Sequence, residues 1–157
     1  MKKISNPFTR LGEFNCFGCS PKNKFGLKMV FVEEEEKIIS FWQPLEYYQG
    51  YHNVLHGGIQ ATLMDEIASW VVFVKLKTAG VTHEMKVKYK KPLYTNEGKL
   101  KVIGKLIKHK MNLAIIKTEI KNSKDEICAR GEITYYLFSK EVAQSKLSYP
   151  RDDDFYK

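Results

Sequence analysis

The chain has 157 residues, of which 43% are apolar and 28% are charged, and its formal net charge is +8 at pH 7. This size and composition predict one globular domain, residues 1–157, with an adequate core. The apolar runs are too short for a membrane span, the N-terminus lacks the apolar stretch of a signal peptide, and three cysteines make no disulfide framework, so we expect a cytoplasmic protein with no membrane partner.

Two strands are predicted early in the chain and one long helix in its middle. Residues 1–24 are mixed and rich in turns. Lys28–Val32 and Lys37–Trp42 have strand character on either side of the acidic run Glu33–Glu36, which is typical of a solvated hairpin tip. The only long helical candidate runs from Gly57 to about Leu76. Its apolar residues lie on nearly all sides, so we expect a curved sheet to wrap around the helix.

Further strands follow the helix, and the chain ends in a polar tail. Gly104 indicates a bulge or bend in one of these strands, and short turns between consecutive strands imply a mainly antiparallel sheet. Residues 139–157 form a polar C-terminal tail that we expect to pack loosely. The predicted fold class is therefore α+β, an antiparallel β-sheet wrapped around one long central helix. The predicted strands are His83–Lys90, Lys99–Leu106, Asn112–Lys121 and Glu126–Phe138.

The sequence His56-Gly57-Gly58 stands at the start of the predicted helix. Two glycines permit a sharp turn, and the first N–H groups of a helix have no intrahelical acceptor. Such a helix end binds a phosphate, a carboxylate or the oxyanion of an acyl-transfer intermediate. Asp65 follows two turns later, where an aspartate caps nothing and is costly among apolar residues, so we expect it to have a function. Its neighbour Glu66 is expected in solvent or beside a lysine.

The pair Cys16-x-x-Cys19 allows two functional interpretations, half of a zinc site or a redox pair. Cys128 is the only other cysteine, and no second Cys-x-x-Cys or His-x₃₋₅-His follows. A zinc site needs more ligands than this pair supplies. The sequence therefore favours two small residues that pack an N-terminal turn, with no metal bound.

Most of the excess positive charge comes from lysines between Lys75 and Lys110. These lysines form either a solvated face or the binding surface for a partner with phosphates, such as nucleic acid or coenzyme A. Arginine, which makes the commonest base-specific contacts, is scarce in the chain. We therefore expect no nucleic-acid partner.

Three segments together resemble the hotdog-fold acyl-CoA thioesterases, and most closely the phenylacetate-pathway type within the hydroxybenzoyl-CoA thioesterase superfamily. They are Asn15–Leu27, which carries the two cysteines and ends in Gly26-Leu27; Gln49–Glu66, with His56-Gly57-Gly58 and an aspartate nine residues after the histidine; and Thr82–Pro92. The resemblance covers residues from about 14 to 138. It implies a hotdog fold and the hydrolysis of an acyl thioester, without a cofactor, to free acid and coenzyme A.

The resemblance also implies roles for individual residues. The Gly57 N–H, helped by Gly58, would form the oxyanion hole, and Asp65 would be the nucleophile or general base. Thr82 would help to position water, and His56 would lie near the thioester carbonyl or orient its loop.

Further residues are implied as substrate contacts. Some family members carry an asparagine six residues before the motif histidine, where this chain has Gly50, and Gln49, His52 or Asn53 are the candidates to replace it. The positions of the lysines, and not the resemblance, predict that some of the cluster Lys86, Lys88, Lys90 and Lys91, or of the group Lys99–Lys110, meet the phosphates of the acyl-CoA substrate.

Helix geometry indicates how the active site is assembled. Asp65 lies eight residues beyond Gly57, which is about 12 Å along a helix axis. It therefore cannot reach an oxyanion held at the start of its own helix, whereas Asp65 of a second subunit can do so in a twofold dimer with antiparallel central helices. The family builds its sites in this way, so we expect a homodimer and, beyond it, a homotetramer.

Two other functions remain as alternatives. A non-catalytic module that binds acyl-CoA or lipid could keep the fold without turnover. A hotdog dehydratase or hydratase is disfavoured, because such enzymes pair an aspartate with a histidine a few residues later, and here no histidine follows Asp65 before His83.

Overall fold

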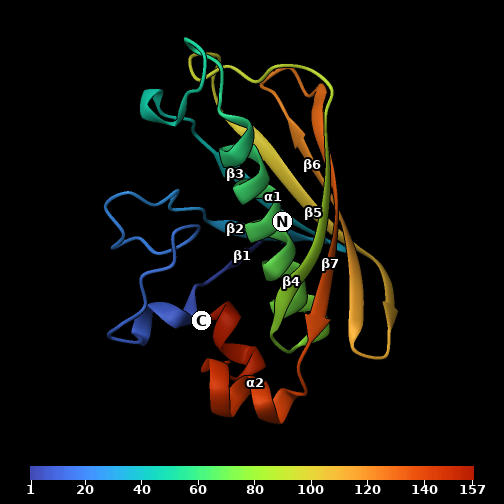
Figure 1. The fold of residues 1–157 in the computed structure, drawn as a ribbon. Helices are drawn as coiled ribbons and strands as arrows, with labels where there is room; N and C mark the ends of the chain where they lie inside the picture. Colours follow the sequence, from blue (N-terminus) through green and yellow to red (C-terminus); the bar gives the residue numbers. More distant parts are fainter.

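The computed structural model describes residues 1–157 as one antiparallel seven-stranded sheet that curves around a long helix (Figure 1). The strand order is β1-β2-β3-β5-β6-β7-β4, so β1 and β4 are the two edges. The predicted α+β fold class is confirmed. The strands are β1 (Lys2–Ile4), β2 (Phe31–Glu34), β3 (Lys37–Trp42), β4 (Gly80–Tyr89), β5 (Leu100–Lys110), β6 (Leu113–Lys121) and β7 (Ile127–Leu137).

The central helix α1 (Gly57–Val71) continues without a break as one π-helical turn, Val72–Leu76. The predicted helix is thus confirmed in type and extent. Lys77, with φ of 55°, ends it in the left-handed conformation. The helix is buried on most sides, as its apolar pattern predicts. Its most deeply buried side chains are Leu63, Met64, Ile67, Trp70 and Val71, which lie against the sheet and the N-terminal segment.

Gly104 lies where β5 crosses the central helix. A Cβ atom at this position would stand 2.9 Å from Cγ2 of Val71, closer than side-chain atoms normally pack. The glycine therefore permits close approach of strand and helix. Of the two alternatives predicted at Gly104, a bulge or a bend, the bulge is wrong, because the register of β5 is regular there and shifts between Leu106 and Lys108.

The hairpin of β2 and β3 turns at Glu35 and Glu36. The expected solvated tip at Glu33–Glu36 is wrong at its first two residues, because Glu33 and Glu34 lie within β2, where they pair with Ile38 and Lys37. The Glu33 carboxylate accepts hydrogen bonds from Lys75 Nζ at 2.5 Å and from Tyr156 at 2.6 Å. Partial burial raises the pKa of Glu33, but these two donors outweigh it and lower the pKa below its ordinary value.

The C-terminal segment is packed, which corrects the expectation of a loose tail. Residues 139–157 form helix α2 (Lys140–Leu147) and a 3₁₀ turn, Asp152–Tyr156, at the end of the molecule where the N-terminal segment also lies (Figure 1). Tyr149 and Phe155 are buried in the aromatic part of the core. These two aromatic side chains hold an otherwise polar segment in place, because burial of aromatic surface stabilises it.

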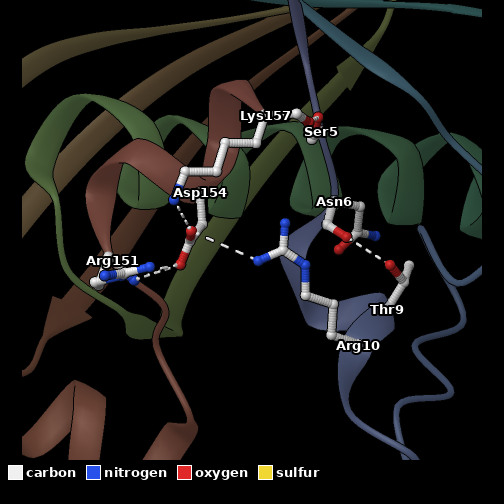
Figure 2. Close-up of polar contacts among 7 residues, drawn as sticks. All are labelled: Ser5, Asn6, Thr9, Arg10, Arg151, Asp154 and Lys157. Atoms are coloured by element: carbon white, nitrogen blue, oxygen red, sulfur yellow. Dashed lines mark hydrogen bonds and ion pairs between the residues drawn. The ribbon is translucent and has the colours of Figure 1, made fainter.

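An ion-pair cluster joins the two ends of the chain. The buried carboxylate of Asp154 lies 3.5, 3.7 and 2.6 Å from the charged groups of Arg10, Arg151 and Lys157, which surround it in Figure 2. The hydrogen bond from Lys157 is the largest cause that lowers the pKa of Asp154. Backbone contact between the termini, Ser5 N–H to Phe155 O at 2.7 Å, adds to the same junction. None of the helices has the length and apolar character that a membrane span requires.

Candidate active site

The start of α1 is capped by the histidine that precedes it. His56 is the N-cap residue, and its Nδ1 accepts a hydrogen bond from the Gly58 N–H at 2.9 Å. Gly57 is the first helical residue, so its N–H has no intrahelical acceptor. Tyr89, at the end of β4, donates its hydroxyl to the Gly57 carbonyl oxygen at 2.7 Å. The cap thus uses the Gly58 N–H and leaves that of Gly57 as the available donor.

Several of the residues expected at the substrate lie together around this helix start. Gln49, His56 and Gly58 line one surface hollow of about 350 Å³, and His56 and Gly57 line a second one of about 370 Å³. Gln49 Oε1 accepts from the backbone N–H of Asn53 at 2.7 Å, and Asn53 has a left-handed φ of 60°. Gln49 and Asn53 therefore shape the loop before the helix.

Asp65 lies two turns further along α1 and is only partly exposed. Its Oδ1 accepts two hydrogen bonds, from Thr82 Oγ1 at 2.7 Å and from the Tyr135 hydroxyl at 2.9 Å. Tyr135 also lies 3.0 Å from the Asp65 carbonyl oxygen. The two donors come from β4 and β7, which pair with each other. One carboxylate oxygen is thus fixed by hydroxyl groups, and no ion pair involves this carboxylate.

The phenol of Tyr135 is a hydrogen-bond donor to Asp65 and keeps its proton. Its side chain is buried in β7, and burial raises its pKa above the ordinary value; the negative charge of Asp65 raises it further. The hydroxyl therefore stays protonated at neutral pH and orients the carboxylate.

The structure brings Thr82 to Asp65 but keeps Asp65 away from Gly57 on the same helix. Lys90 and Lys91 follow β4 directly, next to Tyr89 and hence near the helix start. Lys91 pairs with Glu126 at 3.2 Å, whereas Lys90 is exposed and forms no ion pair. Within one chain, the residues that the sequence groups into one site therefore fall into two groups, one at each end of β4.

Sequence reasoning missed the two tyrosines of these groups. Tyr135 lies at an inward position of β7, between buried Ile133 and Leu137. The alternating pattern of β7 places Tyr135 on the buried face. Because a buried tyrosine needs a hydrogen-bond partner for its hydroxyl, this position was the sequence signal for a polar contact in the core. Nothing in the local sequence distinguishes Tyr89 from an ordinary strand residue.

The expectation that Glu66 lies in solvent or beside a lysine is wrong. Its carboxylate accepts a hydrogen bond from the Trp70 indole at 3.0 Å and stands 3.6 and 3.7 Å from the Cys16 sulfur. The Cys19 thiol hydrogen-bonds to Cys16, which lowers the pKa of Cys16 and raises that of Cys19. Two thiols and the carboxylate of Glu66 therefore form a cluster next to Asp65 in the chain.

Comparisons with known proteins agree with this architecture. The sequence profile of the thioesterase superfamily matches residues 52–129, from the loop before α1 into β7. A solved structure of a thioesterase superfamily protein superposes with a TM-score of 0.71 at 21% identity, covering 77% of this chain and 62% of that protein, less than two thirds of its length. No protein with a curated function matches by sequence.

Two streptococcal structures are similar in fold and were solved with ligands. One is a Streptococcus mutans protein bound to acetyl-CoA, with a TM-score of 0.68, 19% identity and coverage of 83% of this chain and 97% of that one. The other is a hypothetical thioesterase of Streptococcus pneumoniae with coenzyme A, with a TM-score of 0.65, 19% identity and coverage of 70% and 85%. The sheet wrapped around α1 is thus the hotdog fold.

Proposed function

We propose that this chain is an acyl-CoA thioesterase that hydrolyses an acyl thioester to free acid and coenzyme A. The match of residues 52–129 to the thioesterase superfamily and the hotdog fold support this proposal. The observation that carries the proposal is the state of Asp65. This carboxylate lies in an apolar helix, has no cationic partner, and is oriented by two hydroxyl donors. Such an arrangement suits a group that attacks or removes a proton.

In the proposed reaction, the thioester carbonyl oxygen accepts a hydrogen bond from the Gly57 N–H, which stabilises the charge that develops on it. His56 supports this donor, because it holds the helix start through Gly58. Asp65 either attacks the carbonyl carbon or takes a proton from the water that attacks it, with Thr82 as a second contact for that water. On the general-base route the carbon–sulfur bond then breaks, and the leaving thiolate takes the proton that Asp65 removed from water, which gives free acid and coenzyme A. On the nucleophilic route coenzyme A leaves as a thiolate that solvent protonates, and water then hydrolyses the acyl-Asp65 anhydride to the free acid.

Gly57 and Asp65 belong to different subunits of a homodimer in this proposal. They are separated by eight residues on one helix, or about 12 Å, so the two groups of one chain cannot act on the same thioester. The exposed edge strand β4, which carries Thr82, supports pairing with a second copy, since an unpaired strand edge is a template for association. A tetramer would be built from two such dimers.

The carrier is proposed to be recognised near the start of α1. Lys90 is unpaired, and Lys91 holds only the exposed Glu126, so both can face phosphates. Gln49, Asn53 and Gly58 shape the same region. The acetyl-CoA bound by the structurally similar Streptococcus mutans protein supports this choice of carrier.

A panel of acyl-CoA substrates, assayed by thiol release, tests the activity. Wild-type protein should turn over at least one member of the panel. Acyl-CoA binding without thiol release by any member would refute the proposal and point to a non-catalytic binding module.

A mixing experiment tests the shared site. Gly57→Pro removes the N–H at a position where helices tolerate proline, and Asp65→Asn removes the carboxylate. Each variant alone should be inactive, whereas hybrid dimers should recover to about half of wild-type activity, since one of their two sites is intact. Hybrids confirmed by native mass spectrometry but without recovered activity would place both groups in one subunit.

A further inference from the structure

The loop Cys16-Phe17-Gly18-Cys19 packs directly on the side of α1 at Glu66. Three backbone hydrogen bonds fix it: Ser20 N–H to Cys16 O at 3.1 Å, Leu27 N–H to Phe17 O at 2.7 Å, and Met29 N–H to Gly18 O at 2.9 Å. The loop therefore has a defined shape that does not depend on its thiols. The sulfur atoms of Cys16 and Cys19 and a carboxylate oxygen of Glu66 all lie within 4.8 Å of one another.

Glu66 has neutral hydrogen-bond partners but no cationic partner. Its carboxylate accepts a hydrogen bond from the Trp70 indole at 3.0 Å and weaker ones from the Cys16 thiol at 3.6 and 3.7 Å. None of the ion pairs of the chain involves Glu66. A partly buried carboxylate beside two thiols thus lacks a cation, which would neutralise it and favour the thiolates.

The spacing of these groups suits a metal ion. In a tetrahedral zinc site, Zn–S bonds of about 2.3 Å and Zn–O bonds of about 2.1 Å separate sulfur and oxygen by about 3.6 Å. The Cys16–Glu66 contacts are 3.6 and 3.7 Å. Gly18 leaves the room that the carboxylate needs, because a Cβ atom there would lie 2.3 Å from Glu66 Oε2.

We propose that Cys16, Cys19 and Glu66 bind one Zn²⁺ ion, with water as the fourth ligand. All three residues line a cavity of about 390 Å³, whose other lining residues are mainly apolar and include Lys146, so the cavity has room for a water ligand. Binding replaces two thiol protons by the ion, and both protons pass to solvent. The ion ties the N-terminal segment to α1. This inference does not rest on the proposed thioesterase activity, since Asp65 is not a ligand.

A metal titration tests the proposal on the whole chain, without any assay of turnover. Protein that has been reduced and stripped with a chelator is titrated with Zn²⁺ against a chromophoric chelator, and in parallel with Co²⁺. One ion per chain should bind, Co²⁺ should give a sulfur-to-metal charge-transfer band and the intense visible bands of a tetrahedral site, and Zn²⁺ should raise the melting temperature.

Matched variants locate the ion. Cys16→Ser and Cys19→Ser should each weaken Zn²⁺ binding by about 10²-fold or more, because a thiolate ligand is lost, and Glu66→Gln by about tenfold or more. Cys128→Ser and Asp65→Asn, which alter a cysteine and a carboxylate outside the cluster, should bind as wild type does. Circular dichroism checks that each variant is folded.

Three results would overturn the proposal. The first is the absence of stoichiometric Zn²⁺ binding by reduced wild-type protein. The second is unchanged binding by folded Cys16→Ser and Cys19→Ser proteins, which would place the ion elsewhere. The third is unchanged binding by folded Glu66→Gln protein, which would remove the carboxylate from the site.

Discussion

Asp65 and Glu66 are neighbours on α1, but the helix turns their carboxylates toward different parts of the molecule. Asp65 faces β4 and β7 and accepts hydrogen bonds from two hydroxyl groups, Thr82 and Tyr135. Glu66 faces the N-terminal loop and meets an indole and two thiols. Neither has a cationic partner in the chain. We propose that Asp65, oriented by its two hydroxyl donors, reacts with the substrate, and that Glu66 shares a metal ion with the two thiols.

Exchanging each acid for its amide should separate the two roles most clearly. Asp65→Asn should lower thioester turnover by about 10²-fold or more, the scale of a lost acid–base group. Glu66→Gln should leave turnover within about threefold, because it contacts no reacting group in the proposed site. Initial rates of thiol release, with dimerisation checked by light scattering, provide the measurement. Equal losses for both variants would contradict the distinction.

The loop against Glu66 should be sensitive to one added methyl group. Gly18→Ala places a Cβ atom 2.3 Å from Glu66 Oε2, so the loop or the carboxylate must move, at about 1–3 kcal/mol of unfolding free energy. Gly12→Ala is the control, because nothing lies within 4 Å of the added atom. Urea unfolding measures both. If Gly18→Ala is as stable as Gly12→Ala, the packing of the loop on Glu66 is not tight in solution.

Removal of one hydroxyl donor to Asp65 should lower thioester turnover without abolishing it. Tyr135→Phe takes away the 2.9 Å hydrogen bond and leaves that of Thr82. Turnover should fall about tenfold, which corresponds to about 1.4 kcal/mol, the value of one hydrogen bond to a carboxylate. Thr82→Val is the matched variant and should behave similarly. The measurement is kcat for each variant and for the double variant. Full activity of all three would show that the two hydroxyl groups do not position Asp65 for the reaction.

Asp154 differs from Asp65 and Glu66 because it forms ion pairs, so its contribution to stability should depend on pH. Lys157 holds the pKa of Asp154 below its ordinary value of 3.8. The stabilisation by the ionised group is therefore present above that value and is lost as pH falls further below it. Asp154→Asn should lower the melting temperature slightly at pH 7 and flatten its decline toward acid pH, while exposed Asp153→Asn should not. Identical pH profiles of wild type and Asp154→Asn would show that the cluster does not stabilise the fold.

The sequence alone determined the central elements. The helix Gly57–Leu76 follows from an apolar pattern on all sides, and its start follows from two glycines after a histidine. Strand β3 was predicted with its observed bounds, and β6 and β7 to within one residue. These features are local: periodicity and turn chemistry act over a few residues, so the sequence displays them directly.

The tertiary structure decided which side chains meet. Tyr135 reaches Asp65 across 70 positions of the chain, and Cys16 reaches Glu66 across 50. No local pattern encodes such contacts, because they depend on the order of the strands and on how the sheet curves around the helix. The same reason applies to Gly104, whose lack of a side chain lets β5 lie close to Val71 of α1. It applies also to the C-terminal segment, because Tyr149 and Phe155 are buried in a core that the rest of the fold forms.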